Sequence, residues 1–327
     1  MAVYYESSHG VLYQGDALES LRSVADACVQ CVVTSPPYWG LRNYHADGQI
    51  GLEDTPEEHF VALVNLFREV RRVLRDDGTV WLNYGDTYLQ QQGKGFNGNK
   101  RLDMDNRAIS AKRPSWAKQK DLLGLPWRLA FALQADGWFL RSDIVWSKPN
   151  PMPESVKDRP TRAHEYIFLL SKNPRYYYDA EAIREPVAAL TGGQKQSAAA
   201  LSFARIVNEP DRPASIYPQH RPERAAKNAK SFRHGGPYTH GGAFDNSTNQ
   251  ANATSGDTPN DSGTRNRRTV WTVPTFGCPD AHFATFPPAL IEPCILAGSR
   301  RGDLVLDPFM GSGTTGMVAR RLGRRWM

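Results

Sequence analysis

The stretch Val305-Leu306-Asp307-Pro308-Phe309-Met310-Gly311-Ser312-Gly313-Thr314-Thr315 decides the fold of this chain. An apolar strand ends at Asp-Pro, a glycine-rich turn follows, and a helix is predicted to begin at Thr314. Gly311 and Gly313 carry no side chain, so a ligand can approach the backbone closely. The first N–H groups of the helix are suited to a carboxylate or a phosphate. The stretch therefore predicts an α/β sheet with a ligand site at the end of a strand.

Two better-known glycine-rich loops do not explain this turn. A phosphate-binding loop would carry Gly-Lys-Ser/Thr at the start of the helix, and the turn has no lysine. Gly311, Gly313 and Gly316 do have the G-x-G-x-x-G spacing of a dinucleotide loop. That match is weak by itself, and the preceding Asp-Pro-Phe is foreign to the dinucleotide motif. A tight turn without a ligand stays open as the simpler alternative.

A second loop follows the apolar strand Val29–Thr34. The adjacent Pro36 and Pro37 cannot continue a central strand, so the chain must leave the sheet there. The Ser35 hydroxyl and the Pro36 carbonyl are acceptors that could make the amino group of a base more tetrahedral and more nucleophilic. Tyr38 could stack on a base flipped out of a duplex. Taken alone, the loop would be interpreted as a Pro-Pro turn after a strand.

Strands and helices alternate along most of the remaining chain. Thr55 and Pro56 are predicted to begin an amphipathic helix that Asp76-Asp77-Gly78 ends. Further helices are expected at 17–24, 124–136 and 287–297, and further strands at 10–16, 79–83, 139–146, 166–171 and 303–306. Residues from about 90 to 120 are polar and glycine-rich, which predicts a mobile loop. The alternation predicts an α/β sheet with a strand pair near its end.

A basic, irregular segment interrupts this alternation from about Thr191 to Arg268. The net charge of the chain is +6, and eleven Lys and Arg face six Asp and Glu between Thr191 and Val270. A local positive surplus suits a polyanionic partner. The low periodicity is typical of a disordered insert or of an irregular module, and a solvated linker stays open.

Composition excludes several classes of protein. No apolar run approaches the ~20 residues that span a bilayer, and the N-terminus lacks the pattern of a secretory signal. The four cysteines, Cys28, Cys31, Cys278 and Cys294, are too few for a disulfide framework. Cys28 and Cys31 lie within Ala27–Val33, a segment typical of a buried strand, which favours buried thiols over a metal site. We therefore expect a cytoplasmic protein that binds no metal.

In number and order, these motifs resemble those of the amino-methylating DNA methyltransferases of the permuted, beta class, in which the catalytic motif precedes the cofactor motif. The similar segments are 15–16, 35–38, 146–151, 164–170, 282–287 and 307–315. The resemblance implies a three-layer, Rossmann-like methyltransferase sheet, circularly permuted, with an irregular target-recognition insert. It also implies S-adenosyl-L-methionine as the cofactor and double-stranded DNA as the partner.

The resemblance assigns roles to individual residues. Catalysis is assigned to Ser35, Pro36, Pro37 and Tyr38. Cofactor binding is assigned to Asp16, His282, Phe283, Ala284, Phe286, Pro287, Asp307, Phe309, Gly311, Ser312, Gly313, Thr314 and Thr315. The target-base pocket is assigned to Trp39, Lys148, Pro149 and Asn150. The basic residues that could contact DNA are Arg205, Arg221, Arg224, Lys227, Lys230, Arg233, Arg265, Arg267 and Arg268.

The same resemblance implies three parts of the chain: a catalytic half at 1–190, a target-recognition insert at 191–268 and a cofactor half at 269–327. Serine at position 35 is similar to the cytosine-N4 group, whereas adenine-N6 enzymes more often carry Asp there. We therefore expect base flipping and direct methyl transfer to cytosine N4 within restriction–modification, with a cognate endonuclease acting separately.

Three alternatives to this function stay open. The first is methylation of adenine N6. The second is a protein-glutamine methyltransferase, which would be expected to carry Asn at position 35. The third is a truncated DNA-binding remnant without activity, because the family's ribose-binding strand would begin at Arg325-Trp326-Met327, where this sequence stops.

Overall fold

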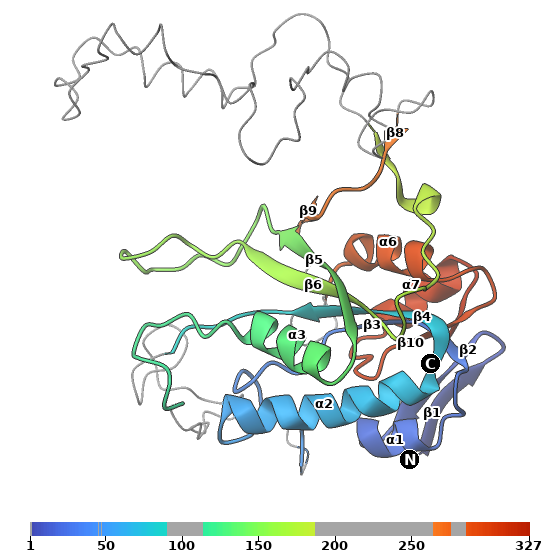
Figure 1. Cartoon of the computed structure of the whole chain (residues 1–327), viewed down its shortest axis with the longest axis horizontal. Coiled ribbons are helices and arrows are strands. Elements are labelled where there is room, and N and C mark those ends of the chain that lie inside the picture. Colours follow the sequence, from blue (N-terminus) through green and yellow to red (C-terminus); the bar gives the residue numbers. More distant parts are fainter. Residues whose placement is uncertain (1, 45, 47, 90–113, 187–263, 276–285) are drawn as a thin grey trace, which may run out of the picture. The chain divides into compact units, whose positions relative to one another are not determined.

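The computed structural model describes the whole chain except residues 1, 45, 47, 90–113, 187–263 and 276–285 (Figure 1). Contacts between residues divide it into two units, one of Met1–Arg184 with Arg267–Met327 and one of Glu185–Asn266. In the second unit, β7 (Glu185–Pro186) pairs antiparallel with β8 (Thr264–Arg265). Most of the predicted insert, and most of the predicted loop at 90–120, lie outside the described residues.

The first unit is built on one mixed sheet. Within the described residues its strand order is β1-β2-β11-β10-β3-β4-β6-β5-β9. The strands are β1 (Ala2–Ser7), β2 (Gly10–Gln14), β3 (Val29–Thr34), β4 (Leu74–Tyr84), β5 (Phe139–Ser147), β6 (His164–Ser171), β9 (Val270–Thr272), β10 (Leu304–Leu306) and β11 (Arg325–Trp326). The run from β2 to β4 is parallel, and β6 is antiparallel to both of its neighbours. The predicted strand pair is therefore β5 and β6.

Helices cover both faces of this sheet (Figure 1). One face carries α1 (Ala17–Arg22), α2 (Pro56–Val73) and α3 (Leu125–Ala135), and the other carries α6 (Pro288–Gly298) and α7 (Thr314–Arg321); a short 3₁₀ turn spans Glu181–Ile183. Side chains alternate between the faces of a strand, so each central strand feeds two cores. In β3, Val32 packs in the core that contains α2 and α3, whereas Cys31 and Val33 pack in the core that contains α6. The predicted three-layer α/β fold is confirmed.

Local signals placed α2 correctly at its start and less well at its end. The Thr55 hydroxyl accepts from the Glu58 backbone N–H, and the Glu58 carboxylate accepts from the Thr55 N–H. Asp76-Asp77-Gly78 does not end the helix, because β4 already begins at Leu74. The pairing between β3 and β4 shifts register after Val29, so exposed Asp76 lies within an irregular part of the strand.

The N-terminal strand β1 had no counterpart in the sequence prediction. All of its residues except the last are exposed, so it shows no apolar alternation. It pairs only with β2, at the edge of the sheet. An edge strand without a buried face leaves no hydrophobic pattern to detect.

Gly298, at the end of α6, lies against the sheet too closely for any side chain. A Cβ there would lie 2.7 Å from Cys31 Sγ and from Thr79 Oγ1. Overpacking costs about 1–3 kcal/mol, and the helix propensity of alanine offsets about 1 kcal/mol of that. Gly298→Ala should therefore lower the free energy of unfolding by up to about 2 kcal/mol, measured by urea denaturation. Ala289→Leu, on the exposed face of the same helix, is the control; an equal loss there would contradict the packing argument.

Candidate active site

The two loops singled out in the sequence meet at one edge of the sheet. β3 and β10 are neighbouring parallel strands, with Val32 opposite Leu306. Directly beyond this pair, the Thr34 hydroxyl donates to Asp307 Oδ1 at 2.6 Å, across 273 positions of sequence. The carboxyl ends of adjacent parallel strands are where open α/β sheets bind ligands. The glycine-rich turn and the Ser35–Tyr38 loop therefore form one candidate site.

Asp307 holds the glycine-rich turn from inside the protein. Its carboxylate is 4% exposed and also accepts from the Thr315 hydroxyl at 2.7 Å and from the Phe309 N–H at 3.0 Å. Burial raises the pKa of Asp307 to about 6, and the three donors limit the rise because they favour the ionised form. Both carboxylate oxygens are thus engaged, and Asp307 joins β3, the turn and α7.

The backbone of the turn is open on its outer side. Gly311 and Gly313 have φ angles of +54° and +84°, in the left-handed region that favours glycine. A Cβ built on Gly313 would have no atom within 4 Å. Gly313 also precedes α7, whose N-terminus has no side-chain cap. The N–H groups at this helix end are therefore available to an anionic group.

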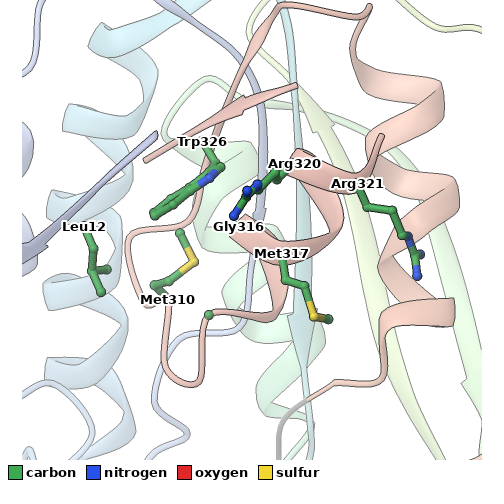
Figure 2. A pocket seen from close by; sticks show the side chains of 8 residues that line it. Leu12, Met310, Gly316, Met317, Arg320, Arg321 and Trp326 are labelled. Carbon is green, nitrogen blue, oxygen red and sulfur yellow. The ribbon is translucent and has the colours of Figure 1, made fainter. Parts of the chain in front are cut away.

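A pocket of about 470 Å³ runs from this turn along α7 and β11 (Figure 2). It is lined by Leu12, Met310, Gly313, Gly316, Met317, Arg320, Arg321 and Trp326. Its walls are largely apolar, and none of the Ser35–Tyr38 loop lines it. The pocket is therefore a surface separate from that loop.

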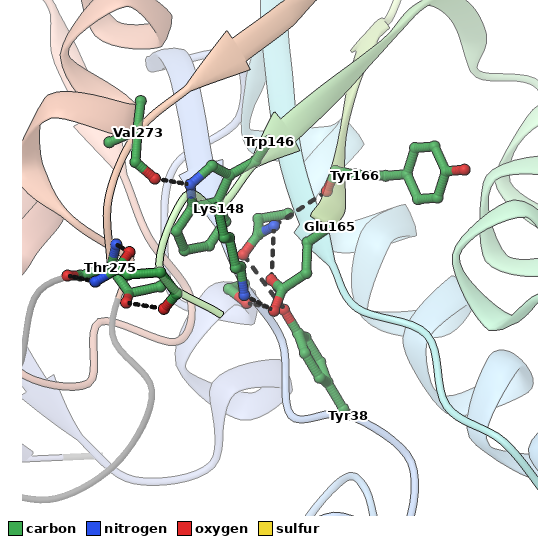
Figure 3. A network of polar contacts seen from close by, with 10 residues as sticks. Tyr38, Trp146, Lys148, Glu165, Tyr166, Val273 and Thr275 are labelled. Atoms are coloured by element: carbon green, nitrogen blue, oxygen red, sulfur yellow. Dashed lines mark hydrogen bonds and ion pairs between the residues drawn. The ribbon is translucent and has the colours of Figure 1, made fainter. Parts of the chain in front are cut away.

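The Ser35–Tyr38 loop is tied to a polar network (Figure 3). The Tyr38 hydroxyl donates to Glu165 Oε2 at 2.9 Å, and the Ser35 hydroxyl donates to Tyr38 Oη at 3.4 Å. The Tyr38 ring packs against Tyr84, with 4.7 Å between ring centroids. Burial, and then the neighbouring Glu165 carboxylate, raise the pKa of Tyr38 well above its ordinary value. Tyr38 is therefore a protonated donor.

Glu165, on β6, is the centre of this network. Its second oxygen forms an ion pair with the Lys148 ammonium, which lies 4.2 Å from the centroid of the Trp146 ring. Asn83, at the end of β4, donates to Glu165 Oε2 at 3.3 Å and to the Tyr166 carbonyl at 3.0 Å. Neither Glu165 nor Asn83 was among the predicted site residues. The available signal was a polar side chain beside an apolar run: Glu165 directly precedes the run at 166–170, and Asn83 directly follows the run at 80–82.

A second, buried series of hydrogen bonds joins the residue after the Ser35–Tyr38 loop to the protein interior. The Trp39 N–H donates to Tyr84 Oη at 3.2 Å, and His59 Nε2 lies 2.8 Å from the same oxygen. His59 Nδ1 lies 2.8 Å from Glu53 Oε2. Burial raises the pKa of Glu53, but His59 and backbone N–H groups more than offset this and leave it below its ordinary value. Trp39, which the resemblance assigns to the base pocket, is 2% exposed and packs in the hydrophobic core.

Comparison with known proteins decides the family. The sequence model of the DNA methylase family, which covers N6 and N4 amino methylation, matches residues 29–327. This chain belongs to the DNA methylase family. It is 43% identical to the Type II methyltransferase M.Cfr9I of Citrobacter freundii, over 98% of this chain and 83% of that protein. It is also 43% identical to the Type II methyltransferase M.SmaI of Serratia marcescens, over 95% of this chain and 82% of that protein.

A solved structure supports the fold of this DNA methylase. The PvuII DNA methyltransferase (cytosine-N4-specific) superposes with a TM-score of 0.57 at 18% identity, over 99% of this chain and 82% of that one. At this identity the likeness concerns the fold alone. The predicted family and its methyltransferase sheet are both confirmed.

Three other predicted cofactor residues of the DNA methylase lie just after a strand or just before a helix. Asp16 follows β2, and its carboxylate caps α1 by accepting from the Glu19 N–H at 2.9 Å. Phe286 and Pro287 are buried just before α6. His282, Phe283 and Ala284 lie outside the described residues.

The predicted pocket and DNA residues of this methylase fall into three groups. Lys148 belongs to the Glu165 network, whereas the exposed Asn150 exchanges hydrogen bonds with the Thr275 backbone and Pro149 beside it is exposed. Arg265 pairs with Glu185 in the second unit. The Arg267 guanidinium lies 4.6 Å from the Trp271 ring centroid, and Arg268 is exposed. The other six, Arg205, Arg221, Arg224, Lys227, Lys230 and Arg233, lie outside the described residues.

The structure describes residues 2–44, 46, 48–89, 114–186, 264–275 and 286–327. In that part of the chain no group of three or more His, Cys, Asp or Glu is arranged to hold a metal ion. No helix there is long and apolar enough to cross a membrane. Cys31 is fully buried, and burial raises its pKa to about 12, so it stays a neutral thiol.

Proposed function

We propose that this DNA methylase transfers a methyl group from S-adenosyl-L-methionine to the N4 amino group of cytosine in duplex DNA. The observation that carries the proposal is the Thr34–Asp307 hydrogen bond. It holds a turn suited to a ligand and a loop suited to an amino group at neighbouring strand ends. A reaction between two bound partners requires such a juxtaposition.

The turn fits the cofactor. S-adenosyl-L-methionine carries a carboxylate, and the uncapped N-terminus of α7 offers N–H groups to an anion. The open space beside Gly313 lets a ligand reach the backbone. When bound, the cofactor supplies a methyl group made electrophilic by its sulfonium. We assign its binding to Asp16, His282, Phe283, Ala284, Phe286, Pro287, Asp307, Phe309, Gly311, Ser312, Gly313, Thr314 and Thr315.

The Ser35–Tyr38 loop fits the amino group of a base. The lone pair of an exocyclic amino group is delocalised into the ring, so the group must become more tetrahedral before it attacks a methyl group. The Ser35 hydroxyl hydrogen is directed at Tyr38, which leaves the Ser35 oxygen free to accept an amino hydrogen. The Pro36 carbonyl is the second acceptor, and Pro37 restrains the loop. The partly exposed Tyr38 ring is available to stack on a flipped base.

Two features favour cytosine over adenine. Serine at position 35 is similar to the cytosine-N4 group of the family. Lys148 uses one N–H on Glu165 and keeps other donors beside the same network. Along the Watson–Crick edge beside its amino group cytosine has two acceptors, N3 and O2, whereas adenine has N1 alone on that edge and N7 on the opposite side. A lysine donor beside the Ser35–Tyr38 loop, next to this edge of a bound base, therefore suits the pyrimidine better.

We assign DNA recognition to the insert at 191–268, between the catalytic half at 1–190 and the cofactor half at 269–327. Its surplus of positive charge suits the phosphate backbone, and its Arg, Lys and Asn side chains suit base edges. The relatives M.Cfr9I and M.SmaI are Type II methyltransferases. By analogy, we propose that this enzyme protects DNA from a separate restriction endonuclease.

The decisive experiment is nucleoside analysis of unmethylated DNA incubated with the protein and S-adenosyl-L-methionine. N4-methylcytosine is the expected product. N6-methyladenine would keep the reaction and overturn the choice of base. A third outcome is that no methylated base forms. If calorimetry then shows that the protein binds DNA but not S-adenosyl-L-methionine, the protein is a DNA-binding remnant instead.

A further inference from the structure

We propose that the Glu165 carboxylate receives the proton released by methyl transfer, through a chain of hydrogen bonds from Ser35 to Tyr38 to Glu165. This inference rests on the proposed function, because it follows the amino proton of the base. It adds two residues, Glu165 and Asn83, that the sequence motifs did not assign. It also gives the Tyr38 hydroxyl a role distinct from ring stacking.

The direction of the chain follows from what each group can donate. The Tyr38 hydroxyl has one hydrogen and two acceptors within reach, Glu165 Oε2 at 2.9 Å and Asn83 Oδ1 at 3.3 Å. The shorter contact, to the carboxylate, is the stronger one, so the hydrogen is directed at Glu165 Oε2. The Tyr38 oxygen is then free to accept from Ser35, whose hydroxyl lies 3.4 Å away. The two hydrogen bonds therefore run in one direction, from Ser35 through Tyr38 to Glu165. Aligned hydrogen bonds polarise one another, so the Ser35 oxygen becomes a better acceptor for an amino hydrogen.

The proton balance of the step is complete. The carbon–sulfur bond of the sulfonium breaks as the nitrogen–carbon bond forms, which leaves a neutral thioether and a positively charged methylated amino group. That group loses one proton to Ser35 Oγ, while the Ser35 proton moves to Tyr38 Oη and the Tyr38 proton moves to Glu165 Oε2. The nitrogen lone pair returns to the ring, and Glu165 ends neutral. A positively charged exocyclic nitrogen is far more acidic than a carboxylic acid, so the transfer runs toward Glu165.

Two side chains hold Glu165 ready for this transfer. Lys148 pairs with Oε1, and the side chains of Lys148 and Glu165 are 17% and 15% exposed. Such a shielded cation stabilises the carboxylate before the reaction without occupying Oε2. Asn83 donates to Oε2 at 3.3 Å, and its own carbonyl oxygen lies 3.3 Å from Tyr38 Oη. Lys148 on Oε1 and Asn83 on Oε2 thus hold the Glu165 carboxylate in place opposite Tyr38.

The test compares Tyr38→Phe, Glu165→Gln and the double variant. Each keeps the shape of the side chain, and Tyr38→Phe keeps the ring that would stack on the base. We expect each single change to lower the single-turnover rate about 10- to 100-fold, as for the loss of one hydrogen bond to a charged group. The double variant should be no slower than the slower single variant, because both changes interrupt one chain.

Tyr166→Phe is the matched control. Tyr166 is next to Glu165 on β6, and its ring points away from the network in Figure 3. It takes part in the network only through its backbone carbonyl. The single-turnover rate of Tyr166→Phe should stay within about twofold of the wild-type rate, because this change removes no hydrogen bond of the network. Dissociation constants for DNA and cofactor should be unchanged in all four variants.

The acidic limb of the rate–pH profile separates a relay from a structural role. The amide of glutamine cannot take up a proton, so an acidic limb seen in the wild-type rate should be absent in Glu165→Gln. A full rate in Tyr38→Phe, additive losses in the double variant, or an unchanged acidic limb in Glu165→Gln would each overturn the relay.

These outcomes are distinct from failure of the proposed function. If the wild type methylates adenine, the choice of base is wrong, but the variants still test the relay because an amino proton is released in both reactions. If the wild type methylates no base, the proposed reaction and the relay are overturned together. If it methylates cytosine and Tyr38→Phe is unimpaired, only the relay is wrong.

Discussion

Replacing Ser35 with alanine should lower the single-turnover rate of methyl transfer by about 10²–10³-fold, the usual cost of removing one preorganised polar group at a reacting centre. Ser35 directly follows β3. Its hydroxyl oxygen is the proposed acceptor of the amino hydrogen, and its hydroxyl hydrogen is donated to Tyr38. Alanine removes that acceptor and keeps the two prolines that restrain the loop. The rate is measured with saturating S-adenosyl-L-methionine and an excess of enzyme over DNA.

The control for this prediction is Ser8→Ala. Ser8 lies exposed in the turn between β1 and β2, where its hydroxyl bonds only to His9. It should leave the rate unchanged, and both variants should bind DNA and cofactor like the wild type. A Ser35→Ala protein with the full rate would show that the loop does not act on the amino group.

Replacing Asp307 with asparagine should change how stability depends on pH. Burial raises the pKa of Asp307 from 3.8 in the unfolded chain to about 6 in the fold. Between these values the folded state binds more protons than the unfolded state, so the free energy of unfolding falls as pH rises. The stability of the wild type relative to Asp307→Asn should therefore fall by about 2–3 kcal/mol between pH 4 and pH 7.

Urea denaturation of both proteins at each pH measures this difference. The contributions of all other titrating groups cancel, because the two chains differ at one position only. Asparagine has nearly the same shape, and its carbonyl oxygen can still accept from Thr34 and from the Phe309 N–H. Two stability curves that stay parallel from pH 4 to pH 7 would show that Asp307 does not titrate in this range.

Short sequence motifs were enough to predict those parts of the site that are formed by residues close together in the sequence. The glycine-rich turn at 307–315 and the helix that begins at Thr314 were both predicted, and the structure adds that Gly311 and Gly313 have left-handed backbone angles. The start of α2 was predicted from Thr55 and Pro56, because a helix cap involves residues only three positions apart. The Ser35–Tyr38 loop was located because two prolines must leave the sheet.

Partners distant in the sequence could not be predicted from such signals. Glu165 meets Tyr38 across 127 positions because β6 pairs with β4, and β4 pairs with β3. A motif shows which side chains can react but not which strands lie together.

The sequence by itself therefore determined the α/β class, the family and the two loops, because each depends on residue type and short-range spacing. Only the tertiary structure decided three contacts: the hydrogen bond from Thr34 to Asp307, the hydrogen bond from Tyr38 to Glu165, and the ion pair between Lys148 and Glu165. The physical reason is strand order. Hydrogen bonds between side chains of different strands form only after the sheet has brought the strand ends together, and no local pattern specifies that order.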